Sequence, residues 1–201
     1  SCGNSSPTKV TAQSLNFKPE RQTLDIIVEP YGKNQEWVEF RKFYGMFALH
    51  LRPSQNLKSR MYELKYEFFK EGKKSGELIL GYDKLGTIAN SMFNDSLLHF
   101  YAFPLSDTAY KFVYNSFPGH TNSILLPLNK KMKETFKWIH LSKGNNFELK
   151  DSVWMPFMAL TQPYIETCTP DKCYYCVLPD NVDHYEDWGS SMGIMQYFIF
   201  S

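Results

Sequence analysis

Apolar and polar residues alternate with a period of two along most of the chain, which is the pattern of half-buried β-strands. The clearest case is the segment 61–82, MYELKYEFFKEGKKSGELILGY, whose centre KEGKKSG has the glycines and polar residues of a turn. The residues that would share the apolar face of its first strand are Tyr62, Leu64, Tyr66 and Phe68. The segment therefore predicts a β-hairpin.

The same alternation recurs on both sides of this hairpin, with the turn signals FPGHTN, SKGNN, PDN and DWGSS between the later segments. Helical periodicity is weak, although residues 34–47 and 129–139 could each hold a short helix. We expect further strands within TLDIIVEPY, GMFALHLRP, SLLHFYAFPL, AYKFVYNSF, SILLPL, ETFKWIHLS, FELKDSVWMPFMAL and MGIMQYFIF. These segments predict an all-β fold with minor helix, either an antiparallel β-sandwich or a partly open β-barrel, in a single domain over residues 15–201.

The composition supports this fold and excludes one class of partner. The 16 Phe, 13 Tyr and 4 Trp residues favour strands, where large flat side chains pack well. Lys and Arg number 22 and Asp and Glu 21, so the formal charge is only +1. Nucleic-acid binders carry a basic surplus to neutralise phosphates, and we therefore expect no nucleic-acid partner. The sequence also has no apolar run long enough for a membrane-spanning helix.

The chain opens with SCGNSS, and the following PTKVTAQS is equally small and polar. This opening resembles the mature start of a bacterial lipoprotein, in which a small residue precedes a cysteine that becomes acylated. The resemblance implies that Cys2 is lipidated, that Ser1 is the small residue before it, and that residues 1–14 form a flexible tether. It also implies a membrane-anchored protein of the bacterial cell envelope, facing the periplasm or the cell surface. The alternative is a disordered N-terminus that happens to contain a cysteine.

Three of the four cysteines, Cys168, Cys173 and Cys176, lie close together, and His184 follows them. In an oxidising compartment such cysteines tend to pair, so we expect a disulfide within this group, although the sequence does not fix which two residues form it. The alternative is a structural zinc ion held by the three cysteines and His184. A redox-active Cys173–Cys176 pair is a further option, but CYYC lacks the helix start that activates such a thiol. An iron–sulfur cluster would need a fourth thiolate.

The sequence indicates no catalytic site. The motifs G-x-S-x-G and H-E-x-x-H are absent, as are the glycine-rich nucleotide motifs, and the five histidines are scattered. We therefore expect a non-catalytic binding or assembly module without a cofactor, whose partner is another envelope protein or a small ligand. A small hydrophobic ligand between the sheets is one alternative, and a hydrolase whose residues meet only in the fold is another.

Overall fold

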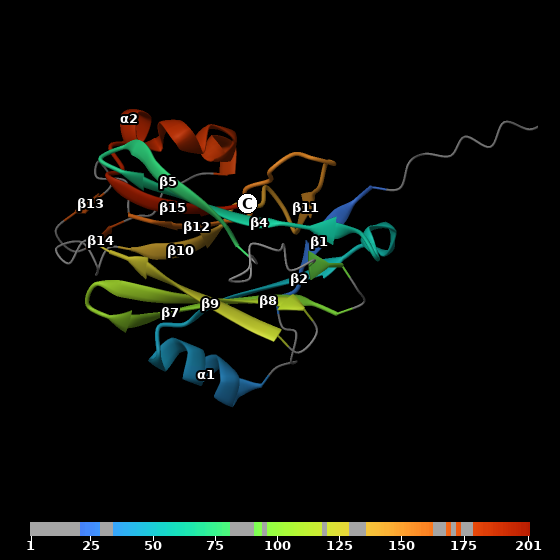
Figure 1. Cartoon of the computed structure of the whole chain (residues 1–201). Helices are drawn as coiled ribbons and strands as arrows, with labels where there is room; N and C mark the ends of the chain where they lie inside the picture. The colour runs from blue at the N-terminus through green and yellow to red at the C-terminus, as the bar shows by residue number, and fades with distance from the viewer. Residues whose placement is uncertain are drawn as a thin grey trace, which may run out of the picture.

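The computed structural model describes residues 21–28, 34–80, 91–93, 96–117, 120–128, 136–162, 168–169, 172–173 and 179–201. Within them, two antiparallel sheets lie face to face and enclose the main hydrophobic core, so the predicted all-β sandwich is confirmed (Figure 1). The predicted tether, residues 1–14, lies outside the described residues.

One sheet has six strands and the other has five. In spatial order, the six-stranded sheet consists of β11 (Asn146–Glu148), β1 (Thr23–Ile26), β2 (Phe47–Pro53), β7 (Leu98–Ser106), β8 (Ala109–Phe117) and β9 (His120–Pro127). The five-stranded sheet consists of β10 (Lys137–His140), β12 (Met158–Thr161), β15 (Gln196–Phe200), β4 (Leu64–Lys70) and β5 (Lys73–Leu80). Two further pairs of short antiparallel strands are β3 (Met61–Tyr62) with β6 (Ser91–Met92), and β13 (Cys168–Thr169) with β14 (Lys172–Cys173).

Helical segments cover the two outer faces. The helix α1 (Gln35–Phe43) lies against the six-stranded sheet, on the side away from the core (Figure 1). It begins at Asn34, whose side chain accepts a hydrogen bond from the backbone N–H of Trp37 at 3.1 Å. On the opposite side of the molecule, η4 (Pro179–Asp187) and α2 (Trp188–Met192) cover the five-stranded sheet. A short helical turn, η1 (Gln55–Leu57), follows β2.

The predicted hairpin is β4 and β5, which pair antiparallel around Glu71 and Gly72. Both turn residues have positive φ angles, 52° and 71°, as the two-residue turn of a twisted hairpin requires. Gly72 also packs directly on Gly189 of α2, where a Cβ atom would lie 2.9 Å from the Gly189 Cα atom. Glycine at this turn therefore allows both the hairpin and the close approach of α2.

The alternation along β4 separates two hydrophobic clusters. Tyr66 and Phe68 pack against the core between the sheets, whereas Phe69 stacks on Tyr197 at 4.3 Å on the outer face, next to the buried Trp188 of α2. Each face of this strand is thus covered by other residues.

A buried carboxylate anchors η4 to the same outer face. Glu67 is 3% exposed and accepts a hydrogen bond from the Tyr185 hydroxyl at 2.7 Å and an ion pair from Lys74 Nζ at 2.5 Å. Burial by itself raises the pKa of Glu67, but the bonds from Lys74 and Tyr185 and the charge of Lys65 outweigh it, so the pKa lies below its ordinary value. The carboxylate therefore stays charged and holds η4 on the sheet.

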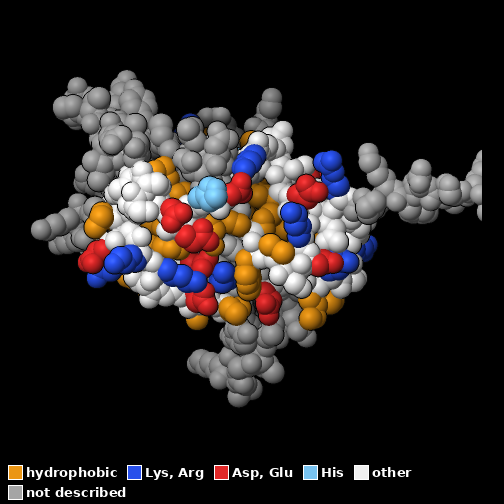
Figure 2. All heavy atoms as spheres, turned by 90° about the horizontal axis from the view of Figure 1, so that it is seen from above, with side chains coloured by type: hydrophobic (Ala, Val, Ile, Leu, Met, Phe, Trp, Pro, Cys, Tyr) orange, Lys and Arg blue, Asp and Glu red, His pale blue; other side chains and the backbone are white. Residues whose placement is uncertain are grey.

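The surface above η4 and α2 has charges of both signs. Lys and Arg side chains alternate with Asp and Glu side chains over this face, and no large region of one sign stands out (Figure 2). The described residues of this face therefore do not concentrate charge of one sign.

Some predicted details differ from the structure. The first strand ends at Ile26, so Val28, which belongs to the predicted strand segment TLDIIVEPY, lies beyond it and is 79% exposed. The segment 147–160, expected to be one continuing strand region, divides into β11 and β12 with a loop between them. The predicted short helix at 34–47 is confirmed as α1, whereas Trp138 and Ile139, from the second candidate helix, belong to strand β10.

Candidate functional site

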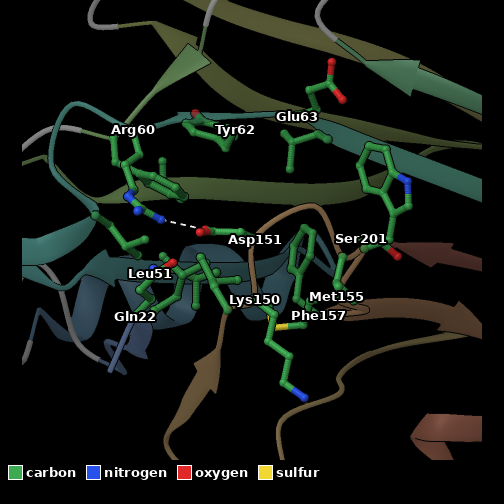
Figure 3. A pocket seen from close by; sticks show the side chains of 18 of the residues that line it. Gln22, Leu51, Arg60, Tyr62, Glu63, Lys150, Asp151, Met155, Phe157 and Ser201 are labelled. Atoms are coloured by element: carbon green, nitrogen blue, oxygen red, sulfur yellow. Dashed lines mark hydrogen bonds and ion pairs between the residues drawn. The ribbon is translucent and has the colours of Figure 1, made fainter. Parts of the chain in front are cut away.

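A pocket of about 570 Å³ opens at one end of the sandwich (Figure 3). There β1, β2 and β7 of the six-stranded sheet face the start of β4 and the residue that follows β15. The loop 149–157, between β11 and β12, forms a side wall. Small-molecule sites in proteins have volumes of roughly 300–1,000 Å³, so this pocket has the size of a ligand site.

The floor of this inter-sheet pocket is apolar. Leu51 of β2 and Leu98 and Phe100 of β7 point inward from the six-stranded sheet, because the alternation along each strand places them on its core face. Leu57 of η1 and Phe157 contribute further apolar walls. All five side chains are at most 9% exposed. A ligand group that reaches this floor would therefore have to be apolar as well.

Charged residues lie at the mouth. Arg60 Nη1 donates a hydrogen bond to Asp151 Oδ1 at 2.6 Å, and this Arg60–Asp151 pair joins the segment before β3 to the loop before β12. In Figure 3 the carboxylate of Glu63 and the ammonium of Lys150 point away from the cavity. A polar ligand group at the mouth would accordingly meet the Arg60–Asp151 pair.

Apolar side chains complete the rim. Met61, Val153 and Trp154 line the pocket and are 65%, 59% and 39% exposed. The ammonium of Lys65 lies 4.8 Å from the centre of the Trp154 ring, a cation–π contact that supports the indole. Exposed apolar residues around an apolar cavity are typical of binding sites.

Ser201 provides a polar atom at the wall. Its backbone N–H and C=O exchange hydrogen bonds of 2.9 Å with Lys65, which fixes its position. Its side-chain oxygen Oγ, in contrast, is buried and has no hydrogen-bond partner within the described part of the chain. Leaving a buried hydroxyl unpaired costs about 1–3 kcal/mol, so a ligand group that bonded to Oγ would be stabilised there.

A second cluster of titratable groups lies on the outer face of the six-stranded sheet. His50 of β2 and His99 of β7 are direct cross-strand neighbours, and their Nδ1 atoms are 2.8 Å apart, so one donates and the other accepts. Burial, followed by the charges of His99 and of Arg41 from α1, lowers the pKa of His50 to about 4. Burial also lowers the pKa of His99. The pair is therefore neutral at pH 7 and acts as a packing contact beside α1.

The structure brings two of the predicted cysteines together and leaves the others undescribed. Cys168 and Cys173 are directly opposite each other in the β13–β14 pair. Cys2 and Cys176 lie outside the described residues. His184 is exposed in η4, at a break in the helical backbone where φ is −129° and ψ is 35°. No group of three or more His, Cys, Asp or Glu residues in the described ranges is arranged to hold a metal ion.

Sequence reasoning offered a ligand between the sheets as an alternative but did not identify the residues of the pocket, and it missed the histidine pair. The pocket combines residues from loops and strands that are far apart in the sequence, such as Leu24, Arg60 and Phe157. The histidine pair depends on β2 lying next to β7, and no local pattern reveals that order. The isolated HFY and LHL triplets around the two histidines were the available signal, because each places a polar ring in a strand of apolar residues.

Neither a family model, nor a curated protein, nor a solved structure matches this chain. The described helices include none with the length and hydrophobicity that crossing a membrane requires. Function must therefore be argued from the residues of the pocket.

Proposed function

We propose that the protein is a non-catalytic binding module that holds the apolar chain of a small amphipathic molecule in the inter-sheet pocket. The apolar floor of the pocket, formed by Leu51, Leu98 and Phe157 between the two sheets, is the observation that carries this proposal. The apolar part of the ligand would lie on this floor, and its polar end would remain at the mouth.

The energetics favour such a ligand. Each methylene group transferred from water to an apolar site contributes about 0.8 kcal/mol. The transfer free energy of several methylene groups on the floor would therefore exceed the cost of the translational and rotational freedom that the ligand loses on binding. A ligand with polar atoms along its whole length would leave those atoms unpaired against Leu51 and Leu98.

Binding of 1-decanol, a neutral alkyl probe, tests the proposal. We expect saturable binding to a single site, measured by displacement of the neutral dye Nile red. Leu98→Trp would fill the pocket from its floor and should abolish binding. Leu125→Trp is the matched control, because Leu125 is 58% exposed on β9, away from the pocket lining. Decanol binding that survives Leu98→Trp unchanged, or its absence in the wild-type protein, would refute the proposal.

The envelope location is a separate part of the proposal. The residues SCGNSS support a lipid on Cys2, with residues 1–14 as the tether between the bilayer and the sandwich. An anchored module of this kind could take up or present an amphipathic molecule near a membrane. Labelling of cells with radioactive palmitate tests the anchor, since the wild-type protein should incorporate label in the membrane fraction and Cys2→Ala should not. Equal labelling of both proteins would contradict the anchor.

We also propose that Cys168 and Cys173 form a disulfide. Their opposite positions in an antiparallel pair support it, because such residues have Cα atoms about 4.5–5.5 Å apart, within the range that disulfides span. Intact mass under non-reducing, non-denaturing conditions separates this proposal from the zinc alternative. A disulfide lowers the mass by two hydrogen atoms, whereas zinc held by Cys168, Cys173, Cys176 and His184 raises it by one metal ion.

A further inference from the structure

The Arg60–Asp151 pair indicates which polar group the ligand of the pocket carries. Resting on the proposed function, we infer that the ligand is a single-chain amphiphile with an anionic head, which replaces the Asp151 carboxylate on the Arg60 guanidinium. The head would be a carboxylate or a phosphate monoester, since both present paired oxygens to the two donors of a guanidinium.

The two partners of the pair differ in how firmly they are held. Arg60 is anchored through its backbone, because its N–H donates to the Leu57 carbonyl and its own carbonyl accepts from the Phe93 N–H, both at 2.9 Å. Asp151 lies in a turn of the loop 149–157, next to Ser152, whose φ is +58°. The Arg60 side chain is 44% exposed and that of Asp151 is 70% exposed.

This difference determines which partner a ligand would replace. The Asp151 carboxylate can turn into water with little loss of contact, because most of its surface already faces solvent. The guanidinium of Arg60 is the more enclosed group and stays at the mouth. An exposed ion pair of this kind contributes only about 0–1 kcal/mol, so exchanging one carboxylate for another has a small cost. The anchored cation therefore selects an anion.

The position of the pair suits an amphiphile. Arg60 and Asp151 lie at the mouth, and the apolar Leu51 lies below them on the floor (Figure 3). A ligand could thus pair its head with Arg60 while its chain enters the cavity. Glu63 and Lys150, whose charged ends point outward, would not contact the head.

The test compares decanoate, decyl phosphate, 1-decanol and decylamine on the wild-type protein and three variants. Asp151→Asn removes the competing carboxylate, and decanoate should then bind about threefold to fivefold more tightly. Arg60→Gln removes the selecting cation, and decanoate should bind about tenfold more weakly. The affinity for 1-decanol should stay within about twofold in both variants, since a neutral head gains nothing from the charge. Comparing the affinities for decyl phosphate and decanoate identifies which anionic head is preferred.

Asp183→Asn is the matched control, because Asp183 forms a similar exposed ion pair with Lys143 at 2.6 Å but does not line the pocket. This variant should leave all four affinities unchanged. Decylamine binding more tightly than decanoate, or Asp151→Asn changing decanol and decanoate affinity by the same factor, would overturn the inference while leaving the proposed function intact. Failure of 1-decanol to bind the wild-type protein would overturn the proposed function and, with it, this inference.

Discussion

The two ends of the space between the sheets differ, although strands β2 and β7 contribute to both. At one end, Trp138 of β10 contacts the rings of Phe47, Phe112 and Phe200, with centroids 5.6–5.9 Å apart. At the other end, leucines and several rings, among them Phe93, Phe100 and Phe157, line an open pocket. Figure 1 shows the two sheets facing each other across this space.

Single strands show how the sequence produces this difference. Along β7, Ala102 pairs with Phe47 and Phe112 at the filled end, and Leu98 pairs with Leu51 at the pocket end. The large rings thus occupy the volume that the small Ala102 leaves, whereas Leu98 lines the open pocket. The filled end provides close packing and stability, which leaves the pocket end free to bind a ligand.

Truncating an aromatic residue should lower the free energy of unfolding more than any other change described below. The loss should be larger at the filled end than at the pocket end. Phe112→Ala at the filled end should lower the free energy of unfolding by about 3–5 kcal/mol, because it leaves a cavity in dense packing. Phe93→Ala at the pocket should lower the free energy of unfolding by less, since the Phe93 ring already borders open space. Chemical denaturation measures both values. Equal losses would mean that the two ends are packed alike.

The histidine pair should affect stability without affecting either end. The folded pKa of His50 is about 4, below the ordinary value of 6.5, so the folded state binds fewer protons than the unfolded state. The stabilisation is fully present above pH 6.5 and is lost as the pH falls towards 4, by up to about 3 kcal/mol at 1.36 kcal/mol per pKa unit.

His50→Phe removes this titration and keeps a ring against Tyr101, which lies 5.5 Å from His50. Its stability should therefore fall less steeply than that of the wild-type protein between pH 6.5 and pH 4 in denaturation experiments. Decanol affinity at pH 7 should be unchanged, because the pair lies outside the pocket. Parallel pH curves for the two proteins would contradict the assigned pKa shift.

A larger side chain should affect stability differently at the two ends of the same strand, β7. Ala102→Leu should destabilise the protein by about 1–3 kcal/mol, because it overfills a closed packing. Leu98→Phe, on the same face of β7, should change stability by less than about 1 kcal/mol, because its added atoms enter the pocket. Thermal unfolding compares the two variants. A larger loss for Leu98→Phe would show that the pocket end is closed.

How far the sequence predicts the structure depends on how local each feature is. The strands β2, β4 and β7 were predictable because one face of each lies on the core, and that burial produces alternation. The helical cover of η4 and α2 was missed because its polar residues, from Asp180 to Ser191, resemble turns. The segment FELKDSVWMPFMAL was expected to hold a strand, yet its residues 149–157 form a loop, and its apolar Val153 and Trp154 form the exposed rim of the pocket.

A crystal structure with 10-bromodecan-1-ol bound would test the central claim most directly, because bromine scatters anomalously and marks the end of the chain. The bromine is expected on the apolar floor, between Leu51, Leu98 and Phe157, with the filled end around Trp138 unchanged. Bromine bound elsewhere, or side chains that close the space above Leu98, would contradict the claim that this sandwich holds an apolar ligand site at one end.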